Sequence, residues 1–259
     1  MGERTSRHAK ATARGIRDRV RPATEAELQA IPWLDALAPA ERRRAEAAVV
    51  VGEAEPGEQV CRVGRAPTYW FGVIDGLLKM SNERADGSQV TYSGLSPGGW
   101  FGEGTAIKRE PYRYTVSALR RSLVAGLPLD TFHWLLDHSI GFNRFVMNQL
   151  NERLGQFIAA VEIDRLNNTD ARVARNLAAL FNPVLFPKVG QMLRITQQEL
   201  AYLVGLSRQR VNESLTALSA QGVICVEYGG LRVLDLAALR QGGRAPQGRR
   251  AVRRPTTEP

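Results

Sequence analysis

The sequence predicts an α+β protein with a β-rich N-terminal domain, one long helix, and a C-terminal helical domain that ends in a β-hairpin. Three observations predict this order. Short apolar runs separated by Gly, Pro and Asp turn residues fill positions 49–129, a pattern typical of an antiparallel sandwich or barrel. Apolar residues then recur every three or four positions within residues 139–168, which indicates a helix. Two capped helical segments and a glycine-centred hairpin follow in residues 169–239.

Length and composition favour two folded domains. The chain has 259 residues, of which 44% are hydrophobic and 24% are charged. No apolar run approaches the roughly 20 residues that cross a bilayer, and no apolar segment follows the basic N-terminus, so we expect a cytoplasmic protein with no membrane partner. The two cysteines, Cys61 and Cys225, are too few to hold an iron–sulfur cluster through four thiolates.

The net charge of +9 lies at the two ends of the chain. Residues 1–22 contain seven Lys or Arg and two acidic residues, and residues 240–259 contain six and one. Neither segment has apolar periodicity, so we expect two disordered basic arms. Two interpretations stay open: the arms attract DNA phosphates without sequence preference, or they are solvated chain ends.

The first domain is expected at residues 23–138. Helix signals interrupted by Pro32 and Pro39 predict two short helices in residues 23–47. Another helical segment opens near Asp130, after the strands. The predicted strands occupy residues 49–55, 59–63, 69–81, 89–95, 114–119 and 122–128.

The long helix, residues 139–168, carries a heptad-like apolar stripe. The stripe could pack against its own domain, as amphipathic helices usually do. A helix of about 25 residues that leads from one domain to the next suits a two-stranded coiled coil better, so we predict a homodimer. The stripe consists of Met147, Leu150, Leu154, Phe157 and Val161.

The C-terminal domain, residues 169–239, has the signals of a winged helix-turn-helix. Thr196 and Glu199 form a capping box before one helix, and Ser207 caps the next. Gly205 lies between them, where a tight turn requires positive φ. The segment behind the second helix predicts a hairpin, the wing, joined at Gly229-Gly230.

The exposed start of the second helix carries side chains that can read base edges. Arginine binds guanine, glutamine and asparagine bind adenine, and glutamate accepts from the cytosine amino group. A recognition helix presents its first turns to the major groove of double-stranded DNA. The alternative is a helical hairpin with a solvated polar face. The predicted base-reading residues are Arg208, Gln209, Asn212 and Glu213.

This domain order resembles the Crp/Fnr family of bacterial transcription regulators, which includes the cyclic-AMP receptor protein. The most specific stretch is ITQQELAYLVGLSRQRVNESL at residues 195–215, and FGE at residues 101–103 is a second match. The resemblance implies an N-terminal β-roll of the cyclic-nucleotide-binding type, a near-palindromic operator and RNA polymerase as a partner. It also implies that Arg208 reads guanine. The DNA-phosphate contacts that it implies are Thr196, Gln198, Ser207 and Arg210.

The resemblance also implies an effector pocket, from which this sequence departs in part. Gly102, Glu103 and Arg113 match residues that hold the cyclic phosphate and the ribose. Tyr114 replaces a serine that grips the phosphate, and Phe157 with Ile158 replaces a Thr-Ser pair that binds adenine. Three interpretations follow: cyclic AMP bound in a modified way, another nucleotide such as cyclic di-GMP, or a ligand-independent regulator in which Glu103 pairs with Arg113.

A β-barrel also suits cupin-like metalloenzymes, the alternative from a different class. Such an enzyme needs several histidines and a carboxylate that converge on a metal. His8 lies in the basic N-terminal arm, and His133 and His138 lie five residues apart in a helical region beyond the strands. We therefore expect a DNA-binding regulator without enzyme activity or a metal site.

Overall fold

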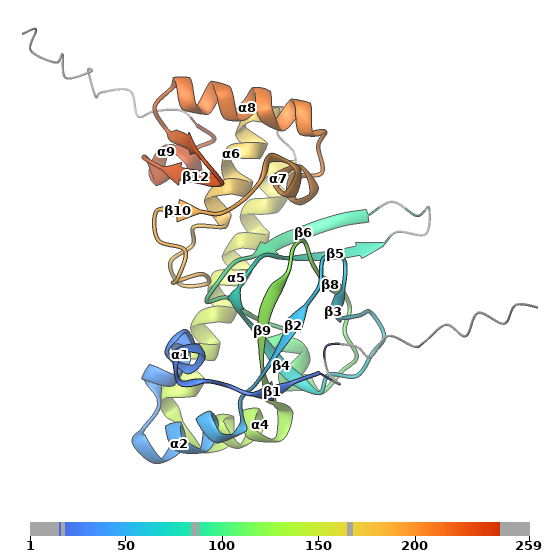
Figure 1. The fold of residues 1–259 in the computed structure, drawn as a ribbon, viewed down its shortest axis with the longest axis vertical. Coiled ribbons are helices and arrows are strands. Elements are labelled where there is room, and N and C mark those ends of the chain that lie inside the picture. The colour runs from blue at the N-terminus through green and yellow to red at the C-terminus, as the bar shows by residue number, and fades with distance from the viewer. Residues whose placement is uncertain (1–15, 17–18, 84–86, 88, 165–167, 244–259) are drawn as a thin grey trace, which may run out of the picture.

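The computed structural model describes residues 16, 19–83, 87, 89–164 and 168–243. A β-roll with short helices occupies the N-terminal part, a long helix leads away from it, and a small helical domain with a three-stranded sheet follows (Figure 1). The predicted α+β fold is confirmed. Among the described residues, no helix combines the length and the hydropathy that crossing a bilayer requires.

Two antiparallel sheets form the β-roll. One sheet has the strand order β1-β2-β9-β4-β7 and the other β3-β8-β5-β6. The predicted strand at residues 69–81 is two strands, because Gly76 adopts a φ of 109° between them. The strands are β1 (Arg21–Pro22), β2 (Val50–Ala54), β3 (Gln59–Cys61), β4 (Tyr69–Asp75), β5 (Leu78–Glu83), β6 (Gln89–Leu95), β7 (Trp100–Phe101), β8 (Thr115–Ala118) and β9 (Ser122–Pro128).

Short helices and aromatic rings close one end of the β-roll. The indole of Trp33 packs against Trp70 and Trp100, with ring centroids 5.7 and 5.2 Å away. Phe142, from the start of the long helix, contacts the Trp33 ring at 5.4 Å, so this cluster anchors that helix to the β-roll. The helices of this domain are α1 (Glu25–Gln29), the 3₁₀ helix η2 (Pro32–Ala36), α2 (Pro39–Ala48), α3 (Glu103–Lys108) and α4 (Leu129–His138).

The inner ends of the predicted basic arm and tail belong to the folded structure. Ile16 is buried, and strand β1 pairs Arg21 and Pro22 with β2. The prediction that the disordered arm extends to residue 22 is therefore wrong for these residues. The apolar Ile16 side chain fills the space left by the missing side chain of Gly52. Arg240 likewise ends a helix and does not start a tail. Residues 1–15, 17–18 and 244–259 lie outside the described residues.

Helix α5 (Ile140–Asp164) confirms the long helix and leaves its stripe uncovered. Met147, Leu154 and Val161 are 59%, 58% and 56% exposed, and Leu150 and Phe157 are 37% and 39% exposed. The alternative that the stripe buries against its own domain is therefore not seen. A single chain presents these apolar side chains to solvent.

The C-terminal domain has the predicted helix-turn-helix and wing, with one additional strand. The wing hairpin turns at Tyr228 and Gly229, one residue earlier than predicted, because Glu227 pairs with Gly230. Strand β10 joins the other side of β12 and was not predicted. The elements are α6 (Thr169–Ala179), β10 (Met192–Leu193), α7 (Gln197–Val204), α8 (Arg208–Ala220), β11 (Ile224–Glu227), β12 (Gly230–Val233) and α9 (Leu236–Arg240).

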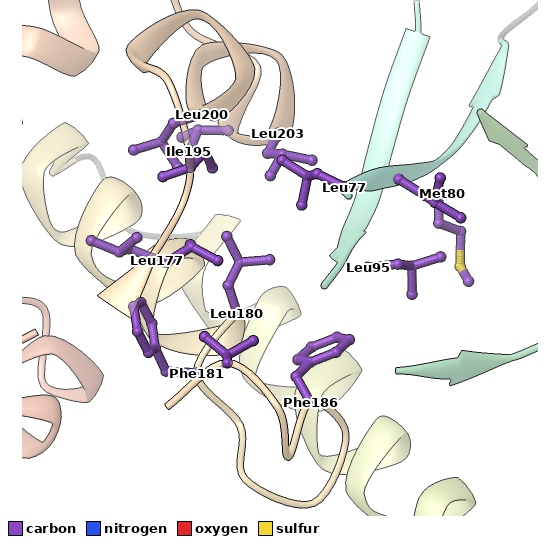
Figure 2. Packing of buried hydrophobic residues seen from close by; sticks show 14 of the residues in the cluster. Leu77, Met80, Leu95, Leu177, Leu180, Phe181, Phe186, Ile195, Leu200 and Leu203 are labelled. Carbon is purple, nitrogen blue, oxygen red and sulfur yellow. The ribbon is translucent and has the colours of Figure 1, made fainter. Parts of the chain in front are cut away.

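The C-terminal domain docks on the β-roll at Gly94 of strand β6. A Cβ atom at Gly94 would lie 2.6 Å from Cδ2 of Leu180 and 2.9 Å from Cδ1 of Leu203. The hydroxyl of Thr91 donates to the Tyr202 carbonyl at 3.1 Å, and one guanidinium nitrogen of Arg120 donates to the Arg194 carbonyl at 2.7 Å. Figure 2 shows Leu180 and Leu203 among side chains that belong to one buried cluster shared by both domains.

Candidate DNA interface and effector cavity

The two helices of the helix-turn-helix are held by the capping groups that the sequence predicts. The Thr196 hydroxyl accepts from the Glu199 amide at 3.1 Å, and the Glu199 carboxylate accepts from the Thr196 amide at 2.7 Å. Gly205 adopts a φ of 69° in the turn, and the Ser207 hydroxyl accepts from the Arg210 amide. These local bonds set the angle at which α8 leaves the domain.

Helix α8 lies at the far end of the molecule from α2 and α4, with one face in the core and one in solvent (Figure 1). Val211, Leu215 and Leu218 are buried, and the Ser214 hydroxyl donates to Asp170 of α6 at 2.6 Å. The predicted base-reading residues Arg208, Gln209, Asn212 and Glu213 are all exposed on the opposite face.

Three of these four side chains already have partners in the free chain. Gln197 donates to the Asn212 side-chain oxygen at 2.7 Å, and Gln209 donates to the Glu213 carboxylate at 3.3 Å. Arg210 donates to the same carboxylate at 2.8 Å and holds the pKa of Glu213 below its usual value. Arg208 makes no side-chain hydrogen bond or ion pair within the part of the chain that the structure describes, so its guanidinium is available to DNA.

The predicted phosphate-contacting residues surround this face. Thr196, Gln198, Ser207 and Arg210 are all exposed, the first two at the start of α7 and the last two at the start of α8. Arg210 lies 3.7 Å from Asp170 as well as close to Glu213, so a DNA phosphate would compete with two carboxylates for it.

The wing adds an aromatic residue that the sequence reasoning did not single out. Tyr228 is fully exposed at the hairpin tip, next to Gly229, whose φ is 80°. Arg232 and Glu227 form an ion pair across the two wing strands. The sequence signal was present, because a tyrosine at a two-residue hairpin turn has no neighbour to cover it.

Glu103 in the β-roll is buried and pairs with an arginine from the long helix. Its carboxylate is 2% exposed and accepts from Nε of Arg153 at 2.7 Å. The same guanidinium donates to the Trp100 carbonyl at 2.7 Å. Arg153 was missed in the sequence because it lies 50 residues from Glu103 and inside an ordinary helical pattern.

Arg113 pairs with Glu110 and not with Glu103. Its side chain is 80% exposed and donates to Glu110 at 3.0 Å, so the pair between Glu103 and Arg113 expected for a ligand-independent regulator is not formed. Tyr112 is buried and Tyr114 is partly buried, and their ring centroids lie 6.0 Å apart, whereas the side chain of Arg113 between them is exposed.

Tyr114 fills part of the space beside Gly102. A Cβ atom at Gly102 would lie 3.6 Å from the Tyr114 hydroxyl oxygen, and the phenol is hydrogen-bonded to the Thr105 side chain. Burial raises the pKa of the Tyr114 phenol well above its usual value, and the Glu103 carboxylate raises it further. The phenol is therefore neutral and keeps its proton at any physiological pH.

A cavity of about 710 Å³ lies between the β-roll, α5 and the C-terminal domain. Five of the six predicted pocket residues line it, and Ile158 does not. Its remaining walls come from β5, β6, α3, α5, α6 and α7. The five are Gly102, Glu103, Arg113, Tyr114 and Phe157.

His133 and His138, the two histidines among the described residues, each have other contacts. His133 contacts the Ala106 carbonyl through Nε2 at 3.0 Å, and the His138 ring stacks on Trp134. Within the described ranges, no group of three or more His, Cys, Asp or Glu side chains could hold a metal ion.

Comparison with known proteins matches both domains. The cyclic nucleotide-binding domain family matches residues 51–139, and the Crp-like helix-turn-helix domain family matches residues 171–241. The transcriptional regulator LdrP of Thermus thermophilus is 30% identical over 176 residues, which cover 66% of this chain and 86% of LdrP. The chain belongs to the Crp/Fnr family of transcriptional regulators.

A second curated regulator and a solved structure also match the chain. Vfr of Pseudomonas aeruginosa, a cAMP-activated global transcriptional regulator, is 27% identical over 169 residues, which cover 63% of this chain and 78% of Vfr. The structure of CLP from Xanthomonas campestris, a c-di-GMP responsive global regulator, matches with a TM-score of 0.52 at 22% identity. That match covers 76% of this chain and 99% of CLP, and it shows a common fold.

Proposed function

We propose that this Crp/Fnr regulator binds a near-palindromic DNA site as a homodimer, with helix α8 of each protomer in the major groove. The observation that carries the proposal is the exposed polar face at the start of α8, where Arg208 has no partner among the described side chains. Asn212, Gln209 and Glu213 lie beside it on the same face, and a purely structural helical hairpin would have no need for this set.

The exposed stripe of α5 supports the dimer. Five large apolar side chains at heptad-like spacing are costly to leave in water, and a second copy of the helix would cover them. A dimer also places two recognition helices on one face of the duplex, about 34 Å apart on successive major grooves.

The experiment is a comparison of Arg208→Ala with Arg210→Ala on DNA. A cognate site is first selected from random duplexes with the wild-type protein, and affinities are then measured by fluorescence anisotropy on that site and on random DNA. Arg208→Ala should weaken binding to the cognate site by about 1 to 3 kcal/mol and leave random DNA almost unchanged. Arg210→Ala should weaken both equally, because a phosphate contact carries no sequence information. Equal loss for Arg208→Ala on both DNAs would contradict its assignment as a base reader.

We also propose that a nucleotide effector controls DNA binding through the cavity beside α3. Support comes from the cavity of about 710 Å³, a volume within the range of small-molecule sites, and from relatives that respond to cyclic AMP or cyclic di-GMP. Calorimetry of the full chain against cyclic AMP, cyclic GMP and cyclic di-GMP, with DNA affinity measured at saturation, tests the proposal. Binding of none of them would favour the ligand-independent alternative.

RNA polymerase and the two basic ends complete the proposal. A regulator bound beside a promoter acts through polymerase, and transcription in vitro from a template with the selected site would show activation or repression.

Deletion of residues 1–15 and 244–259 should flatten the salt dependence of binding to random DNA if the basic ends contact phosphates. Within the described residues, we assign the sensor to 16–138, the dimerisation helix to α5 (Ile140–Asp164) and the DNA-binding domain to 169–243.

A further inference from the structure

One side chain of the sensor contacts the start of the helix-turn-helix. Arg120 lies in the turn between β8 and β9. Its guanidinium donates to the Arg194 carbonyl at 2.7 Å and to the Gly76 carbonyl at 3.2 Å, and another of its nitrogens lies 3.6 Å from the Glu199 carboxylate. We call these three contacts the Arg120 bridge. The bridge joins the β-roll to the segment that leads into α7.

Glu199 links the bridge to the capping box of α7. One carboxylate oxygen, Oε2, accepts from the Thr196 amide at 2.7 Å, and the other, Oε1, faces Arg120. The Glu199 side chain is 11% exposed and that of Arg120 is 31% exposed, so water screens this pair less than it screens a surface ion pair. The sensor turn is therefore connected to the group that caps the first turn of α7.

The backbone of Arg120 is held in place by its own domain. The buried Ser122 hydroxyl donates to the Arg120 carbonyl at 2.8 Å and accepts from the Leu77 amide at 3.2 Å. The Leu119 amide donates to the Leu77 carbonyl at 2.9 Å. A side chain on a turn that is fixed in this way loses little further freedom when it makes the bridge.

Helix α7 is held by the β-roll near both of its ends. The Arg120 bridge holds the N-terminal end, and the Thr91 hydroxyl donates to the Tyr202 carbonyl near the C-terminal end at 3.1 Å. The apolar contact at Gly94 has no preferred direction, whereas two polar contacts separated along one helix define the direction of that helix. The predicted base-reading residues of α8 stay exposed in this docked arrangement, so docking leaves them free for DNA.

We infer that Arg120 is a positioning residue for DNA binding, which holds the DNA-binding domain in a fixed orientation on the sensor. The inference rests on the proposed function, a homodimer on a near-palindromic site. In such a dimer, two fixed domains present both α8 helices at one spacing, so the second half-site is bound at a high effective concentration. Domains without the bridge keep their own contacts with DNA and lose this advantage.

The test compares a duplex that carries the selected site with a duplex in which one half of that site is replaced by random sequence. Arg120→Gln should weaken binding of the full-length chain to the complete site by about fivefold or more, because hydrogen bonds from a charged group are lost. Binding to the half-site duplex should change by less than about twofold. Arg121→Gln is the matched control, because Arg121 pairs with Glu53 and Glu55 inside the sensor, and it should leave both affinities unchanged.

Glu199→Gln tests the same contact from the other domain. A glutamine at this position still accepts from the Thr196 amide, so the capping box is kept while the ion pair is lost. This variant should also weaken binding to the complete site alone. The double variant should bind no more weakly than Arg120→Gln, because both changes remove one contact. Circular dichroism of each variant shows whether it folds.

Two results would overturn the inference: the same affinity for Arg120→Gln as for Arg121→Gln on the complete site, or an equal loss for Arg120→Gln on both duplexes. A wild-type chain that selects no DNA site refutes the proposed function instead. X-ray scattering then decides the bridge by itself, because a domain that pivots about the Gly94 contact samples more extended orientations. Arg120→Gln should raise the radius of gyration, and a radius equal to that of Arg121→Gln would refute the bridge.

Discussion

Replacing Arg153 by methionine should destabilise the β-roll by about 3 to 5 kcal/mol, the usual cost of leaving one partner of a buried ion pair uncompensated. The burial of this ion pair puts the expected loss at the high end of the changes in unfolding free energy that single substitutions cause. Glu103 is 2% exposed, so water cannot solvate its carboxylate, and the Trp100 carbonyl loses its donor as well. Methionine keeps most of the volume and the helix propensity of arginine, so packing contributes little to the loss.

The assay is urea denaturation followed by tryptophan fluorescence. All four tryptophans lie in the sensor, at positions 33, 70, 100 and 134, so the signal follows the unfolding of the β-roll. Glu103→Gln with Arg153→Met should cost less than Arg153→Met alone, because no buried charge is left. A loss below about 1 kcal/mol for Arg153→Met, or a double variant whose loss equals the sum of the two singles, would refute this reasoning.

Three other predictions test the acid stability, the docking and the dimer. The hydrogen bond from Arg21 lowers the pKa of Glu27 to about 2, so the ionised Glu27 stabilises the fold above about pH 5 and this stabilisation is lost as pH falls toward 2. Glu27→Gln should therefore flatten the free energy of unfolding as a function of pH over this range. Superimposable curves for the variant and the wild type would contradict the prediction. Gly94→Val should push Leu180 and Leu203 away and raise the radius of gyration in X-ray scattering, with Gln89→Val on the same strand as the control. Leu154→Glu should lower the mass in light scattering to about 28.6 kDa, and a mass unchanged from the wild type would place the dimer interface elsewhere.

The features that the sequence predicted are those whose causes lie close together in the chain. The capping box joins Thr196 to Glu199 across three residues, and Gly205 and Ser207 act within their own turn. The exposed polar face of α8 follows from these local signals and from helical periodicity, so its residues could be listed without a structure. The same holds for the apolar stripe of α5.

The effector cavity was predicted less well because its contacts are distant in sequence. The resemblance left a pair between Glu103 and Arg113 as one alternative, but Arg113 pairs with Glu110 and the partner of Glu103 is Arg153, 50 residues away in the sequence. Arg172 comes from a different domain, and only the docking at Gly94 brings it to the cavity. Ile16 shows a similar effect, since one apolar residue within a basic segment carries no periodic signal.

The shared hydrophobic cluster has a consequence for how the chain unfolds. Buried residues such as Met80 in β5 and Leu215 in α8 belong to one continuous cluster, so the two domains of a docked chain form a single cooperative unit. Amide hydrogens of α8 then exchange with solvent only when the whole unit opens. A ligand in the cavity would slow exchange at the DNA-reading helix without touching it, and the same experiment on Gly94→Val would separate the two domains into independent units.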